Sequence, residues 1–115
     1  MDLNLTDEQK KAMASVLIDI MNADDNIHEE EVKYLKQLQE ALEISEEEIE
    51  ECLHLSVVNS MRIIRGLDHL QKQAFSFMMT EMIKADGEVD SREADVLTVV
   101  CLGADIPVPT EDSQG

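Results

Sequence analysis

The sequence predicts an all-α fold: a compact helical bundle of about six helices with an internal duplication of a helix–acidic turn–helix unit. Three observations support this prediction. Apolar residues recur at helical spacing along most of the chain. A short acidic pattern occurs twice, at residues 23–31 and 85–93, with an offset of 62 residues. The same offset continues outside the turns, where Gln9 corresponds to Gln71.

Length and composition favour one folded domain. A chain of 115 residues can bury a single hydrophobic core. We therefore expect one helical domain over residues 1–106 and a flexible tail over residues 107–115, which contains two prolines and no periodicity. The formal net charge is -17, but 43% of the residues are apolar, and this favours a packed core over disorder.

The negative charge also limits the classes of partner. Nucleic acids and anionic lipids are bound by neutralising phosphates with Lys and Arg, and this chain has 9 basic against 26 acidic residues. We therefore expect no nucleic-acid binding and no membrane insertion. Cations and proteins with a basic surface are the partners that this charge favours.

The first unit is predicted to begin at Thr6, which has capping-box spacing with Gln9. The helix that follows should run to about Asn22. One face of it carries apolar residues at the i, i+3, i+4, i+7 and i+8 positions, namely Met13, Val16, Leu17, Ile20 and Met21. After the first acidic turn a second helical face follows, formed by Val32, Leu35, Leu38 and Leu42.

Two short helices are predicted in the connector between the units. Ser45 and Glu48 have the spacing of a second capping box. The helix that they start is expected to turn three side chains inward, those of Ile49, Cys52 and Leu53. Residues 56–65 should form a further short helix that ends near Gly66.

The second unit opens near Asp68. Its first helix, over residues 70–83, is apolar on more than half of its circumference, and this predicts the central helix of the bundle. The last helix, over residues 94–102, is rich in β-branched residues, which leave a strand as the alternative. Helix is favoured, because residues 91–95 have a helix-like sequence.

Capping is one interpretation of the two acidic turns. Gly87 supplies the left-handed residue that many helix ends require, and Asp25 is its counterpart in the first unit. Asp90 is then the cap of the next helix, with Glu93 in the first turn and Glu31 in the equivalent place. Capping alone explains nearly all of the motif without a ligand.

A cation site is the other interpretation. The second turn offers oxygen ligands of the kind that suit Ca²⁺ or Mg²⁺, from Asp86, Glu88, Asp90 and Glu93. A standard EF-hand is excluded. With Gly87 at the sixth loop position, Met82 and Lys84 fall at positions one and three, where oxygen ligands are required. A non-standard site stays open.

The two turns, A-D-D-x-I-x-x-x-E and A-D-G-x-V-D-x-x-E, together with the short connector and Leu102–Ile106, resemble the TerB-like family. That family includes the tellurite-resistance protein TerB and the N-terminal domain of the co-chaperone DjlA. The resemblance covers about residues 6–106. It implies an all-α bundle with an internal repeat, an association with stress, and acidic clusters proposed to bind metal.

Carried over residue by residue, the resemblance implies metal ligands in both units: Asp24, Asp25 and Glu31 in the first, and Asp86, Asp90 and Glu93 in the second. The first unit departs from the pattern, with Asp25 at the glycine position and His28 at the second acidic position. A protonated His28 would repel a cation. We therefore expect weak Ca²⁺ or Mg²⁺ binding at the second unit and none at the first.

No enzyme is predicted, because His28, His54 and His69 are scattered, with no nucleophile motif or glycine-rich loop beside them. Cys52 and Cys101 lie in apolar runs and are expected to be buried, reduced thiols. A cytoplasmic location is expected, since no secretory signal and no run of roughly 20 apolar residues is visible. Two functions stay open: a non-enzymatic, stress-associated protein that binds a divalent cation, and a metal-free docking module whose acidic surface binds a basic protein.

Overall fold

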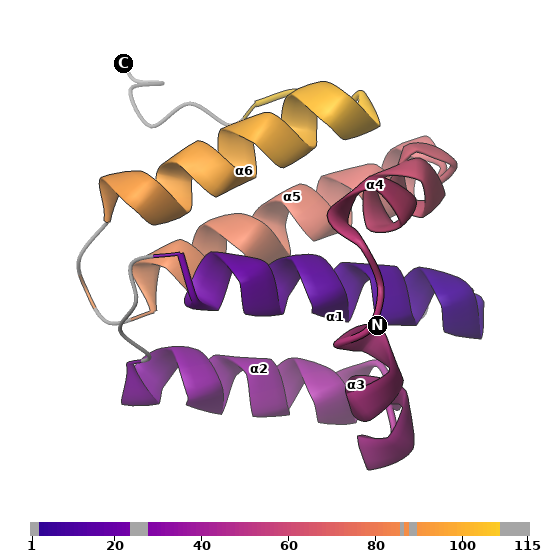
Figure 1. Ribbon diagram of the computed structural model, residues 1–115, viewed down its shortest axis with the longest axis horizontal. Coiled ribbons are helices and arrows are strands. Elements are labelled where there is room, and N and C mark those ends of the chain that lie inside the picture. The colour runs from indigo at the N-terminus through magenta and orange to yellow at the C-terminus, as the bar shows by residue number, and fades with distance from the viewer. Residues whose placement is uncertain (1–2, 24–27, 86, 88–89, 109–115) are drawn as a thin grey trace.

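The structure is a computed structural model that describes residues 3–23, 28–85, 87 and 90–108. Over these residues the chain forms six helices and no strand, packed as one bundle (Figure 1). The helices are α1 (Asp7–Met21), α2 (Glu29–Ala41), α3 (Glu46–Cys52), α4 (Val57–Arg65), α5 (His69–Lys84) and α6 (Ser91–Ala104). This confirms the all-α prediction, including a helix rather than a strand over residues 94–102.

Side-chain caps define where the helices begin. The capping boxes predicted at Thr6 and Ser45 are both present. A third forms at Asp68, whose carboxylate accepts a hydrogen bond from the backbone N–H of Gln71 at 2.8 Å. The caps of the four long helices keep the 62-residue offset, because Thr6 corresponds to Asp68 and His28 to Asp90. Superposition of the two units stays a prediction.

The core is organised around α1, so the prediction of a central α5 is wrong. α1 packs against α3, α4, α5 and α6. The small side chains of Ala12, Ala14 and Ser15 are buried in it together with the large apolar ones. Small residues let neighbouring helices approach closely, and a pattern based on large apolar residues overlooks them. α5, by contrast, leaves Leu70 63% and Phe77 62% exposed.

The connector differs from expectation at one residue. Cys52 is buried as predicted, but Leu53 is 59% exposed. α3 ends at Cys52, and Leu53 is its C-cap. Because the helical path stops there, the i, i+4 spacing from Ile49 no longer directs Leu53 toward the core.

The two units meet at one end of the bundle. The C-terminal ends of α1 and α5 and the N-terminal ends of α2 and α6 all lie on the left of Figure 1. The first turns of α2 and α6 therefore lie at the same end of the bundle, although they are far apart in the sequence. None of the described helices combines the length and the apolar character of a bilayer span.

We expect Gly87→Val to lower the free energy of unfolding by about 1–2 kcal/mol, because a β-branched residue is strained at positive φ. The φ angle of Gly87 is +89°, and a Cβ there would meet no described heavy atom within 4 Å. The loss would thus come from the backbone and not from a clash. Urea unfolding measures it. Gly87→Asn is the matched control and should lose less, since Asn enters the left-handed region more readily; equal losses would contradict this account.

Candidate metal centre

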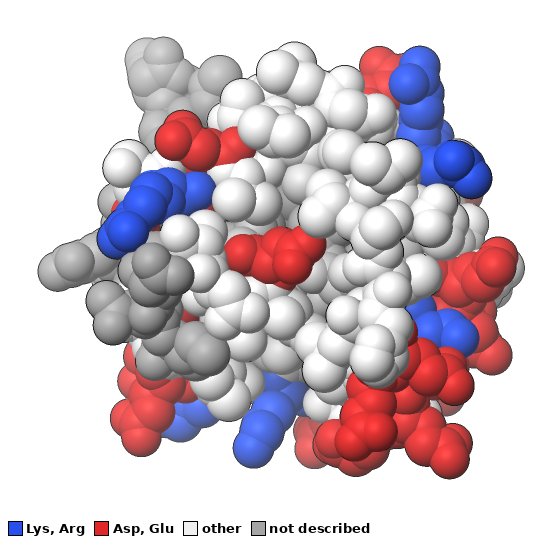
Figure 2. Space-filling model, in the orientation of Figure 1, with Lys and Arg blue, Asp and Glu red and all other residues white. Residues whose placement is uncertain are grey.

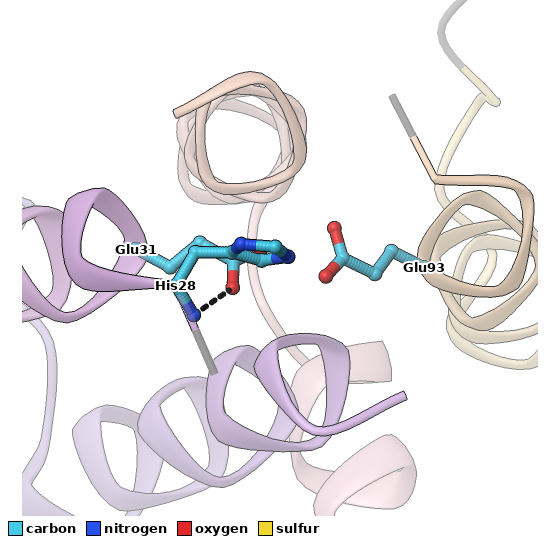
Figure 3. A group of neighbouring side chains, drawn as sticks. All are labelled: His28, Glu31 and Glu93. Carbon is cyan, nitrogen blue, oxygen red and sulfur yellow. Dashed lines mark hydrogen bonds between the residues drawn. The ribbon is translucent and has the colours of Figure 1, made fainter. Parts of the chain in front are cut away.

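Three side chains converge where the two units meet: those of His28, Glu31 and Glu93 (Figure 3). His28 is the N-cap of α2, and Glu31 lies in the first turn of the same helix. Glu93 lies in the first turn of α6. One imidazole nitrogen and one oxygen of each carboxylate all lie within 4.8 Å of one another. The described part of the chain contains no second group of this kind. We call these three residues the His28 group.

Helix capping explains why the Glu31 carboxylate lies at this place. Its Oε1 atom accepts the backbone N–H of His28 at 3.4 Å, the reciprocal bond of a capping box. Its Oε2 atom is buried and has no hydrogen-bond partner among the described residues. Capping therefore uses one oxygen of Glu31 and leaves the other for a ligand.

The two carboxylates are buried almost completely, Glu31 being 0% and Glu93 1% exposed. Burial of an ionised carboxylate costs several kcal/mol unless charges or hydrogen bonds compensate it. Two carboxylates that approach each other add mutual repulsion. The positive ends of the α2 and α6 dipoles offset part of this cost, about 0.3–1 kcal/mol each. A positive charge between the carboxylates would offset more of it.

The spacing of the His28 group suits a single metal ion. Ligand atoms at about 2.0–2.2 Å from one tetrahedral metal ion lie about 3.3–3.6 Å apart. The ligand atoms of the group lie within 4.8 Å of one another, so the side chains would have to close by up to about 1.5 Å to bind one ion. Three protein ligands leave further coordination positions for water.

The structure joins residues that the sequence assigned to two separate clusters. Glu31 from the first unit and Glu93 from the second lie in one group. Asp90 is not a member of it. The Asp90 carboxylate instead caps α6, accepting the backbone N–H of Arg92 at 2.8 Å and lying 3.6 Å from the Arg92 guanidinium. The other predicted ligands lie outside the described residues and stay predictions: Asp24, Asp25 and Asp86.

His28 is the candidate ligand that the sequence pattern did not reveal. It stands where the second unit has Asp90, and its possible positive charge was an argument against a cation site. In the structure its ring points toward the Glu93 carboxylate (Figure 3). A neutral imidazole is a common metal ligand. The available signal was the i, i+3 spacing of His28 and Glu31, which places both side chains on one side of a helix start.

The chain is similar to a protein family and to a solved structure over most of its length. Residues 12–108 match the family described as Tellurite resistance protein TerB. The crystal structure of a protein of unknown function from Porphyromonas gingivalis W83 has a TM-score of 0.72 and 16% sequence identity, and the match covers 96% of this chain and 89% of that one. At this identity the likeness concerns the fold alone. No curated protein matches the chain.

We expect Asp90→Asn to leave both the stability and any metal response of the protein near those of the wild type. Asn and Asp cap helices about equally well, and Asp90 is outside the His28 group. Thermal unfolding with and without divalent cations tests both points. A metal response that shrinks in Asp90→Asn would show that Asp90 also binds the ion.

The buried thiols should be protected from alkylation. Cys52 and Cys101 are free and buried, and burial raises the pKa of each thiol to about 11. The thiolate is the reactive form and would be roughly a thousandth of the total at pH 8, rising as the pH approaches 11. Iodoacetamide should therefore label the native protein far more slowly than the urea-unfolded chain, as mass spectrometry can measure. Rapid labelling at pH 8 would contradict the burial of the thiols.

Proposed function

The chain belongs to the TerB family, and we propose that it is a non-enzymatic, stress-associated protein that binds one divalent cation between its two helical units. The observation that carries this proposal is the convergence of two buried carboxylates, Glu31 and Glu93, with an imidazole nitrogen of His28. The family description names tellurite resistance. We extend that association to this chain as part of the proposal.

A cation in the His28 group would connect two helices that are distant in the sequence. Glu31 belongs to α2 and Glu93 to α6. An ion bound to both would hold the N-terminal ends of these helices together. A ligand that binds only the folded state stabilises it, by about 2.7 kcal/mol at a hundred times its dissociation constant. The free energy of unfolding would then rise with the concentration of the cation.

A second candidate function is a metal-free docking module for a basic protein. Figure 2 shows acidic side chains gathered at the lower right of the molecule, in the region of α3. Four carboxylates of α3 are exposed, those of Glu46, Glu47, Glu50 and Glu51. A partner with clustered Lys or Arg would complement this surface. We place both functions in the cytoplasm, where the free thiols would stay reduced.

Substitution of the carboxylates tests the cation proposal. In chelator-treated protein, Glu31→Gln and Glu93→Gln should each be at least as stable as the wild type. A Gln amide can donate a hydrogen bond to the remaining carboxylate, whereas two carboxylates repel each other. On addition of a divalent cation the melting temperature of the wild type should rise, and each variant should lose most of that rise.

The matched control is Glu47→Gln, which removes the same charge from an exposed position on α3. It should keep the full cation response. Differential scanning calorimetry measures the change in melting temperature, and titration calorimetry measures cation binding directly. A wild-type protein that no divalent cation stabilises would contradict the cation proposal and leave docking as the function.

A further inference from the structure

We infer that the ion held by the His28 group is a transition-metal dication of the Zn²⁺ type and not Ca²⁺ or Mg²⁺. This inference rests on the proposed function, because it concerns the same three residues. Carboxylates alone led us to expect Ca²⁺ or Mg²⁺. The structure adds a nitrogen ligand from His28 to the two carboxylates, and this changes the class of metal that the group suits.

The ligand types favour a transition metal. Ca²⁺ takes six to eight oxygen ligands, and Mg²⁺ requires an octahedron of oxygens. Imidazole suits Zn²⁺, Fe²⁺, Ni²⁺ and Cu²⁺ better than these hard ions. In the His28 group one of three protein ligands is a nitrogen. Neither buried thiol belongs to the group, so thiolate-selective metals are not favoured either.

The number of ligands and their burial also favour a transition-metal ion. Zinc sites with three protein ligands of the N and O type and one water are common. Mg²⁺ gives up its water ligands reluctantly. Glu31 and Glu93 are 0% and 1% exposed, so an ion bound to both must lose most of its hydration shell. A buried site with few ligands therefore disfavours Mg²⁺ as well as Ca²⁺.

The N-terminus of α2 places two of the three ligands, His28 and Glu31, side by side. The backbone N–H of His28 is held by Glu31 Oε1 at 3.4 Å, and Glu31 Oε2 is buried without a hydrogen-bond partner among the described residues. The imidazole and this oxygen thus come from a single helical turn. Glu93 approaches from α6 on the other side of the ring (Figure 3). Part of the side-chain entropy of Glu31 is therefore already lost before an ion binds.

Titration calorimetry on the full chain, treated with chelator, tests the inference with Zn²⁺, Ca²⁺ and Mg²⁺ as the ligands. The wild type should bind Zn²⁺ at least about tenfold more tightly than Ca²⁺ or Mg²⁺. His28→Asn removes the imidazole nitrogen, keeps a good helix cap and adds no charge beside the two buried carboxylates, so the variant should fold. Its affinity for Zn²⁺ should fall at least about tenfold, while its affinity for Ca²⁺ should not fall. In ¹⁵N spectra of the wild type, Zn²⁺ should shift the imidazole nitrogens of His28.

The control variant is His54→Gln. His54 is exposed and lies beside Glu47, Glu50 and Glu51, where an adventitious Zn²⁺ ion could bind. If the Zn²⁺ signal is lost in His54→Gln and kept in His28→Asn, the ion is an adventitious surface ion and the inference is wrong. Retention of Zn²⁺ binding and of the His28 shift in His54→Gln supports the inference.

The outcomes for the metal class and for the site are distinguishable. If the wild type binds Ca²⁺ or Mg²⁺ as tightly as Zn²⁺, and Glu31→Gln abolishes that binding, the inference is overturned while the proposed function stands. If no cation binds in a way that depends on Glu31 and Glu93, both are overturned. A His28 resonance that does not respond to bound Zn²⁺ overturns the inference alone.

Discussion

The burial of two carboxylates, Glu31 and Glu93, is the constraint on which this bundle depends. Each lies in the first turn of a helix, and both are excluded from solvent. Without compensation their cost would be a large part of the 5–15 kcal/mol that stabilises a typical domain. Helix dipoles and capping supply part of the compensation. A cation bound by both carboxylates would supply more, and it would link the two units of the chain at the same point.

The packing of α1 brings these carboxylates together. Its buried small residues, Ala12, Ala14 and Ser15, allow α5 and α6 to pack against the same helix as α3 and α4. The turns that follow α1 and α5 consequently lie at one end of the bundle (Figure 1). The His28 group therefore contains residues from both units, although each residue lies beside only one acidic turn in the sequence.

Local interactions could be predicted from the sequence, and those that depend on tertiary packing could not. Caps such as Thr6 and Ser45 are visible because both partners lie within three residues. The position of Leu53 depended on where α3 ends, and the central place of α1 depended on small residues. Glu31 and Glu93 could each be assigned to a helix start, but their pairing required the arrangement of the helices. The position of His28 beside Glu93 could not be predicted for the same reason.

Capping and ligand binding are not exclusive explanations of the acidic turns, as a comparison within the chain indicates. The third residue of α5 is Gln71, which is buried and completes a capping box by accepting the backbone N–H of Asp68 at 3.0 Å. Its amide nitrogen also donates to the carbonyl oxygen of Leu3 at 2.7 Å. A buried cap in this fold is thus satisfied by a neutral side chain. At the same position of α2 and α6 the chain has Glu31 and Glu93, whose charge capping does not require. The proposed function gives this negative charge a role, because a cation in the His28 group would be bound by both carboxylates.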